Sequence, residues 1–68
     1  MTRKEINAIY ETLKSIANDL SKEADEIHND SLYITCDYLQ GKYIAILNAM
    51  MIIYDKQSEL LKMEVDND

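Results

Sequence analysis

The chain has 68 residues, a formal net charge of −6, one cysteine, one glycine and no proline. A chain this short forms one domain at most and buries only about 60% of its unfolded surface, so it is marginally stable alone. A single cysteine excludes an internal disulfide, and no Cys/His cluster suits structural zinc. Oligomerisation is the remaining way in which small domains are commonly stabilised.

The acidic charge balance disfavours direct binding to nucleic acid or to an anionic membrane surface, although it equally serves solubility. The apolar run from Tyr43 to Tyr54 is shorter than the ~20 residues that span a membrane. Arg3 and Lys4 are not followed by the apolar segment of a secretion signal. Because an unpaired cysteine fits a reducing compartment, a cytoplasmic location is expected.

A first helix is predicted over about residues 3–28. Thr2 and Glu5 have the spacing of a capping box, in which the two residues exchange hydrogen bonds at a helix N-terminus. The apolar residues that follow recur in steps of three and four and define one amphipathic face. They are Ile6, Ile9, Tyr10, Leu13, Ile16, Ala17, Leu20, Ala24 and Ile27.

A break is predicted at residues 28–31, with Asn29 in a left-handed conformation and Asp30 or Ser31 capping the next helix. The second helix is predicted over about residues 31–63, with a kink allowed at Gly41. So short a connection makes the two helices antiparallel neighbours. Facing positions should then sum to about 59, with Ile6 near Ile53. Residues 1–63 form a single domain, and residues 64–68 form a frayed acidic tail.

The second helix carries two apolar rows. The first row, which should face the first helix, contains Leu32, Cys36, Leu39, Tyr43, Leu47, Met50, Tyr54 and Leu61. Three residues lie between the rows: Ile46, Ile53 and Leu60. The second row lies beyond the reach of the first helix and would form an exposed apolar strip, which monomers rarely tolerate. It is therefore the predicted dimer interface, made of Ile34, Tyr38, Ala45, Ala49 and Ile52. The expected fold is an all-α hairpin that dimerises into a four-helix bundle with coiled-coil packing.

The turn end of the hairpin should be acidic. Between residues 19 and 37 the only base is Lys22, which leaves that end with a charge of about −5. This acidic tip is a candidate surface for a basic protein partner, or simply a solvated end. It consists of Asp19, Glu23, Asp25, Glu26, Asp30 and Asp37.

Residues that carry enzymatic chemistry are scarce. His28 and Cys36 should lie within about 10 Å of each other, but Cys36 falls on the inward row and His28 suits a helix C-terminus. No phosphate-binding loop, nucleophile elbow or paired metal motif is present in the sequence. No catalytic, cofactor or metal site is predicted. Tyr33 and Tyr38, near the turn, are candidates for an interaction hot spot.

Residues 37–47, Asp-Tyr-Leu-Gln-Gly-Lys-Tyr-Ile-Ala-Ile-Leu, resemble a YxxGKxxAL stretch in short helical-hairpin accessory proteins of phages and mobile elements of low-GC bacteria. The resemblance covers eleven of the 68 residues. It implies a small accessory or host-interaction factor, and it implies no site residues.

The sequence therefore predicts a non-enzymatic, dimeric protein-interaction module with a regulatory or inhibitory role. One alternative is a small structural subunit that docks its second row into a larger helical assembly. Another is an acidic nucleic-acid mimic that inhibits a host defence protein or a DNA-binding protein through the tip.

Overall fold

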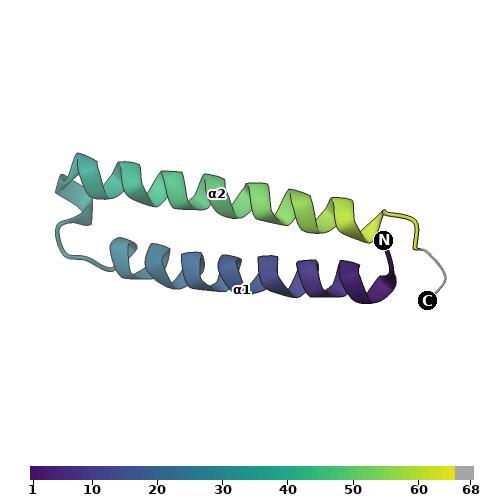
Figure 1. The fold of residues 1–68 in the computed structure, drawn as a ribbon. Helices are drawn as coiled ribbons and strands as arrows, with labels where there is room; N and C mark the ends of the chain where they lie inside the picture. Colours follow the sequence, from purple (N-terminus) through teal and green to yellow (C-terminus); the bar gives the residue numbers. More distant parts are fainter. Residues whose placement is uncertain (66–68) are drawn as a thin grey trace.

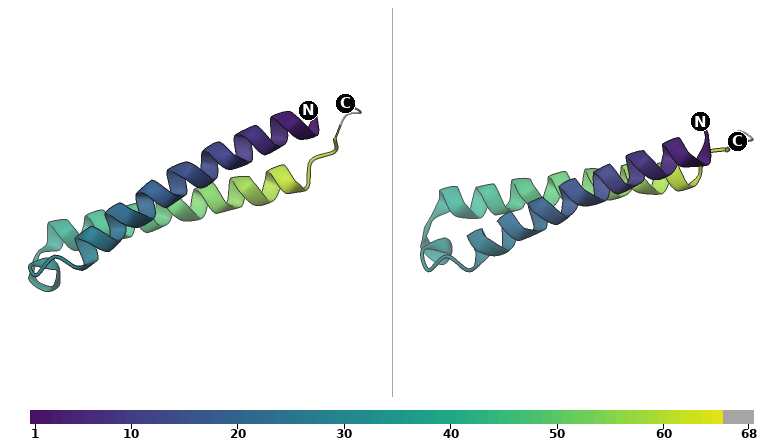
Figure 2. Two further views of the ribbon diagram at one scale, coloured as in Figure 1. Left: turned by 90° about the horizontal axis from the view of Figure 1, so that it is seen from below. Right: turned by 60° about the horizontal axis from the view of Figure 1, so that its bottom comes forward.

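The computed structural model describes residues 1–65 and shows an antiparallel hairpin of two long helices (Figure 1). Helix α1 spans Arg3–His28, a short 3₁₀ turn, η1, spans Tyr33–Thr35, and α2 spans Asp37–Leu61. The molecule is a rod of 54 × 14 × 11 Å, and the two helices stay side by side along its length (Figure 2). The predicted all-α hairpin is confirmed. Of the predicted tail, Glu64 and Val65 lie beyond the end of α2, and residues 66–68 lie outside the described residues.

Helix α1 has the predicted bounds because its N-terminus is capped by its own side chains. The Thr2 hydroxyl accepts a hydrogen bond from the Glu5 amide at 3.1 Å, and the Glu5 carboxylate accepts one from the Thr2 amide at 3.0 Å. This reciprocal pair satisfies two amides that the helix itself leaves free. At the other end, the Asn29 amide donates to the Asp25 carbonyl oxygen at 3.0 Å. Asn29 has a φ of −87°, so the predicted left-handed conformation is wrong.

The second helix begins at Asp37 and not at residue 31, which corrects the sequence-based boundary. The Asp30 carboxylate accepts a hydrogen bond from the Leu32 amide at 2.8 Å and holds a turn where a helix was expected. Cys36 is extended, with φ −112° and ψ 105°. The Gln40 side-chain amide then donates to the carbonyl oxygens of Tyr33 and Ile34, at 2.9 and 2.8 Å. The connection is therefore fixed from within α2.

This longer connection shifts the helix pairing by about seven positions. Lys42 contacts Glu23 at 3.5 Å, and the Gln57 side chain donates to the Tyr10 carbonyl oxygen at 3.4 Å. These pairs sum to 65 and 67, so the predicted sum of 59, and with it the pairing of Ile6 with Ile53, is wrong. Leu60, for which a sum of 59 leaves no facing residue on α1, is buried at the open end of the hairpin.

Heptad spacing defines the seam between the helices. On α1 the buried and half-buried seam residues are Ile6, Tyr10, Leu13, Ala17, Leu20, Ala24 and Ile27. On α2 they are Leu39, Tyr43, Ile46, Met50, Ile53, Gln57 and Leu60. Both sets alternate steps of four and three without a break, which is the pattern of a left-handed coiled coil. Leu39, Tyr43 and Met50 of the predicted inward row are in the seam, but the row is wrong at Leu47, Tyr54 and Leu61, because the seam follows Ile46, Ile53 and Leu60 instead. Leu47, Tyr54 and Leu61 are exposed, as is Leu32 in the connection.

Helix α2 is continuous through Gly41, so the glycine does not break the helix. A Cβ atom at Gly41 would meet nothing within 4 Å, so no close helix approach requires glycine there. Replacing glycine by alanine inside a helix removes backbone freedom from the unfolded chain. We expect Gly41→Ala to raise the free energy of unfolding by about 1 kcal/mol in urea titration. A loss of stability would contradict the open surroundings of this residue.

The capping box makes α1 sensitive to acid. The hydrogen bond from the Thr2 backbone amide holds the pKa of the Glu5 carboxyl below its ordinary 4.5, and a hydrogen bond from the Thr2 side chain makes a smaller contribution in the same direction. A pKa that is lower in the folded state gives stability that is complete above pH 4.5 and lost as pH falls through the folded pKa. We expect the stability advantage of the wild type over Glu5→Gln to shrink as pH falls through that window. Parallel thermal unfolding curves of the two proteins, followed by circular dichroism, measure it. An advantage independent of pH would contradict the role assigned to Glu5.

Candidate interaction surface

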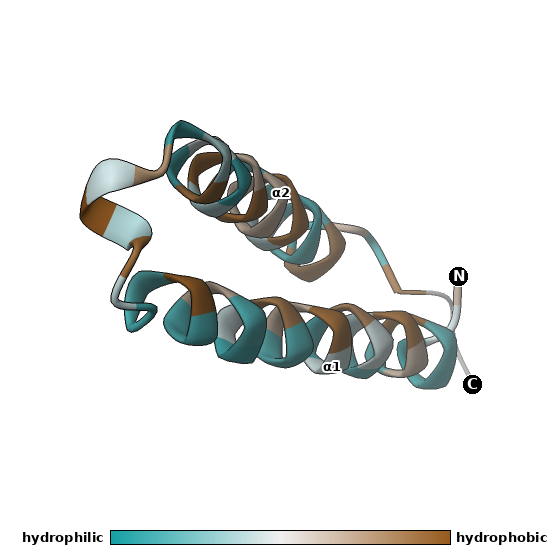
Figure 3. Cartoon of the chain, turned by 90° about the vertical axis from the view of Figure 1, so that its left-hand side faces the viewer, coloured by the Kyte–Doolittle hydropathy of each residue, from teal (hydrophilic) through white to brown (hydrophobic). Residues whose placement is uncertain are grey.

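Helix α2 is apolar on more sides than α1 can cover. In Figure 3, hydrophobic residues follow the edge of α1 that faces α2, whereas they recur around α2. Exposed apolar side chains include Tyr38 and Ile52 of α2, which are 73% and 61% exposed. Ile34, in the neighbouring turn η1, is 82% exposed. The total accessible surface is 5277 Å². A compact protein of 7.9 kDa would expose about 4,400 Å², so the rod carries an excess of roughly 900 Å².

One broad side of the hairpin collects apolar residues from both helices. Residues seven apart lie on one side of a coiled-coil helix, which places Ala49 in line with Lys42 and Lys56. Across the seam, Ile9 and Ile16 are in line with Glu23. The Lys42–Glu23 ion pair shows that these two lines are neighbours. Tyr38, Ala45 and Ile52 form a third line, next to that of Ala49. We call this side the broad face, defined by Ile9, Ile16, Tyr38, Ala45, Ala49 and Ile52.

The predicted dimer interface is therefore largely brought together on the broad face. Tyr38, Ala45 and Ile52 are exposed there, and Ala49 is half-buried beside the seam. Ile34 is not on α2, because it lies in η1, where it is exposed. Sequence reasoning missed Ile9 and Ile16, which are 40% and 45% exposed, because it assigned every apolar residue of α1 to the inward face. Their departure from the unbroken heptad is the signal that could have identified them.

A second apolar strip lies on the other side of α2. It consists of Ile44, Leu47, Met51 and Tyr54, all of which are exposed. We call it the rear flank. A narrow polar line of Asn48 and Asp55 separates it from the broad face. Because α1 covers neither strip, α2 presents two distinct apolar surfaces.

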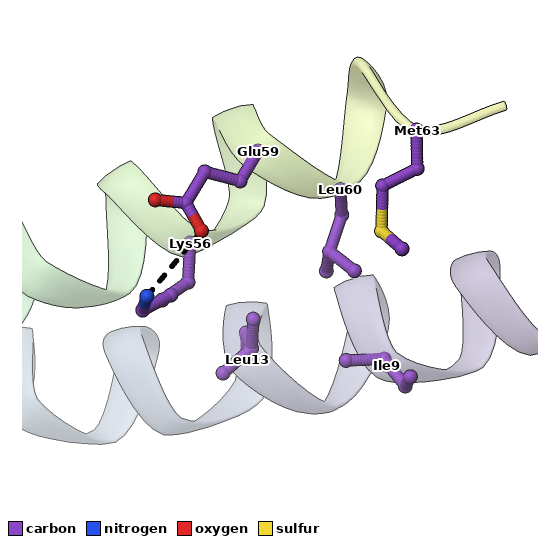
Figure 4. Close-up of a pocket in the computed structure, with 6 residues that line it drawn as sticks. All are labelled: Ile9, Leu13, Lys56, Glu59, Leu60 and Met63. Atoms are coloured by element: carbon purple, nitrogen blue, oxygen red, sulfur yellow. Dashed lines mark hydrogen bonds and ion pairs between the residues drawn. The ribbon is translucent and has the colours of Figure 1, made fainter.

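A shallow groove opens at the end of the broad face that is far from the turn. Ile9 and Leu13 of α1 form one wall, and Leu60 and Met63 form the other (Figure 4). Its volume is about 300 Å³. Lys56 and Glu59 stand at its rim, joined by an ion pair of 3.3 Å. The groove is apolar inside and polar at its edge, which suits an aromatic side chain with a polar end.

The structure places the six residues of the predicted acidic tip toward the turn end of the hairpin. All six of its carboxylates are exposed, and they come from the last part of α1, the connection and the first residue of α2. Glu23 is paired with Lys42, and the Asp30 side chain is engaged by the Leu32 amide. Asp25 and Glu26 stand in the last turn of α1, where the negative end of the helix dipole disfavours carboxylates. Helix stability therefore does not account for these two acids.

An aromatic cluster holds the turn end together. The rings of His28, Tyr33 and Tyr43 have centroids 5.0, 5.3 and 5.5 Å apart. Such contacts add to the stability that area burial gives. Tyr33 is thus half-buried within the hairpin, while Tyr38 projects into solvent, so the two predicted hot-spot tyrosines have different environments.

Over the described range, 1–65, no group of three histidine, cysteine, aspartate or glutamate side chains is placed to hold a metal ion. In that same range no helix is long and apolar enough to cross a membrane.

No protein-family model matches the chain, and neither a curated protein nor a solved structure matches it. The resemblance of residues 37–47 to phage and mobile-element proteins stays a prediction.

Proposed function

We propose that the chain is a non-enzymatic protein-interaction module whose working unit is a homodimer. Two hairpins pack through their broad faces into a four-helix bundle. The observation that carries this proposal is the apolar surface that one hairpin leaves uncovered. The total accessible surface exceeds that of a compact protein of this mass by roughly 900 Å², and each partner in a standard protein interface contributes ~800 Å². The alanines at positions 45 and 49 allow two helices to approach closely.

A charge on the broad face should dissociate this dimer. Ala45 is exposed in the hairpin, so Ala45→Glu leaves the seam intact and places a carboxylate in the proposed interface. We expect the dissociation constant to rise at least tenfold, with the helical circular dichroism signal retained, because a buried unpaired charge is costly. Sedimentation equilibrium measures the mass. Asn48→Glu is the matched control, since it adds the same charge on the polar line and should leave the dimer intact. A monomeric wild type at micromolar concentration would refute the proposal.

A regulatory or inhibitory role would follow from a second partner. A dimer through the broad face leaves the rear flank of both copies exposed, so an apolar surface remains for another protein. The alternative function, a small structural subunit of a larger helical assembly, is favoured by this same observation, because a subunit needs two docking surfaces. The two functions differ in the isolated protein. A dimeric module is monodisperse alone, whereas a subunit without its assembly aggregates through its uncovered surfaces.

The acidic tip supports a further alternative, in which the protein is an inhibitor. The tip would mimic nucleic acid and bind the basic surface of a host defence protein or a DNA-binding protein. Asp25 and Glu26 are unfavourable for helix α1, so their presence suggests selection for binding. The phage or mobile-element origin implied by the resemblance is compatible with such an inhibitor. Charge at such a surface contributes mainly to the association rate and to specificity.

Charge reversal separates the role of the tip from the fold. We expect Asp25→Lys with Glu26→Lys to remove salt-dependent binding of a basic partner and to leave the fold intact, because lysine suits the last turn of a helix. Glu11→Lys with Asp55→Lys is the matched control, with the same charge change away from the tip. Proteins captured from host lysate by each variant are compared by quantitative mass spectrometry. Equal capture by both double variants would remove the tip from the binding mechanism.

A further inference from the structure

The proposed dimer leaves open how the two hairpins are oriented, and the broad face contains features that answer this. Tyr38 projects from one end of that face, and the groove beside Lys56 opens at the other. Ala45 and Ala49 lie between them. The midpoint of the two alanines is position 47, and Tyr38 and Lys56 are each nine residues from it. At a rise of about 1.5 Å per residue, Tyr38 and the Lys56 rim of the groove are each about 14 Å from the centre, and the groove extends outward from that rim.

We infer that two copies pair antiparallel, with Tyr38 of each copy seated in the groove of the other. This inference rests on the proposed homodimer and specifies its geometry. A two-fold axis between Ala45 and Ala49 pairs positions that sum to 94, so Ala45 faces Ala49 and Tyr38 faces Lys56. Such an interface is self-complementary, because both copies give the same projection and the same groove.

The chemistry of the groove suits this occupant. Ile9, Leu13, Leu60 and Met63 present apolar walls to a tyrosine ring. Lys56 stands at the rim, where its ammonium group would contact the face of the tyrosine ring or its hydroxyl oxygen. A cation is attracted to the face of an aromatic ring. Its ion pair with Glu59 is exposed and therefore weak, so it does not hold Lys56 away from an incoming ring.

The distribution of charge favours the same orientation. Residues 17–49 contain six acidic and two basic side chains, a formal charge of −4. Residues 1–16 and 50–68 together contain seven acidic and five basic side chains, a formal charge of −2. Parallel hairpins would bring two acidic tips together, and like charges across an interface are unfavourable. Antiparallel hairpins instead place each tip beside the less acidic end of the other copy, which reduces this repulsion.

Distance measurement between spin labels tests the orientation. In a Cys36→Ser background, a label at Asp37→Cys lies ten residues from the proposed axis. The two labels of an antiparallel dimer should then be about 30 Å apart along the helix direction. A label at Asn48→Cys lies next to the axis, so its pair should be within about 20 Å. Pulsed electron–electron double resonance reads both distances on the same dimer.

The outcomes separate this inference from the proposed function. A long distance between the two labels at position 37, together with a short distance between the two labels at position 48, supports the antiparallel dimer. Short distances at both positions would show a parallel dimer, which overturns the orientation and leaves the proposed function standing. A monomeric mass with no dipolar coupling would remove both.

A paired substitution tests the seat of Tyr38. We expect Tyr38→Ala to raise the dissociation constant of the dimer at least tenfold. Tyr54→Ala is the matched control, because Tyr54 is an exposed tyrosine on the rear flank of the same helix and its loss should change dimerisation less than twofold. Equal effects of the two substitutions would contradict the assignment of the groove.

Discussion

The structure depends on one unbroken seam, in which both helices present residues in alternating steps of four and three. This spacing holds fourteen side chains in register along the rod. Within it, Gln57 is buried and donates to the Tyr10 carbonyl oxygen, the longest-range hydrogen bond described in the hairpin. A polar group in a coiled-coil seam contributes less stability than an apolar one but favours a single register, because any other register leaves it without a partner. The Lys42–Glu23 pair agrees with that register from the other side of the seam.

A seam between only two helices covers one side of each. This covers most of the apolar surface of α1, since the outer side of that helix is polar. It leaves much of the apolar surface of α2 uncovered, because aliphatic residues and tyrosines recur around that helix. The uncovered surface of α2 is therefore not a defect of packing within the hairpin, in which no described buried side-chain nitrogen or oxygen atom lacks a hydrogen-bond partner. It is a surface in excess of what one copy needs, divided by a polar line into two parts that different partners could use.

The sequence predicted the structure correctly where local interactions determine it. Helix α1 has its predicted bounds because the capping box and a clear amphipathic pattern are both local signals. The start of α2 was missed because the turn is held by Gln40, whose bonds to Tyr33 and Ile34 depend on the folded connection. The seam of α2 was misassigned at Leu47, Tyr54 and Leu61 because each has an apolar neighbour in the chain, such as Ile46 beside Leu47, and hydropathy does not distinguish the two. Gln57 is polar and so was not counted among core residues. The broad face could be predicted only in part, since the place of Ile9 beside Lys56 follows from the corrected register.

The hold of Gln40 on the connection has a consequence for the order of folding. The two carbonyl groups that it binds lie six and seven residues before it, outside α2. The turn therefore cannot be completed until the first turn of α2 has formed and has placed this side chain. Helix α1 has no such requirement, because its cap is contained in its first four residues. We expect α1 to form early as a separate helix, and the hairpin to close from the turn end only when α2 has begun. During synthesis, α1 would thus wait with its apolar face uncovered until residue 40 and its neighbours emerge.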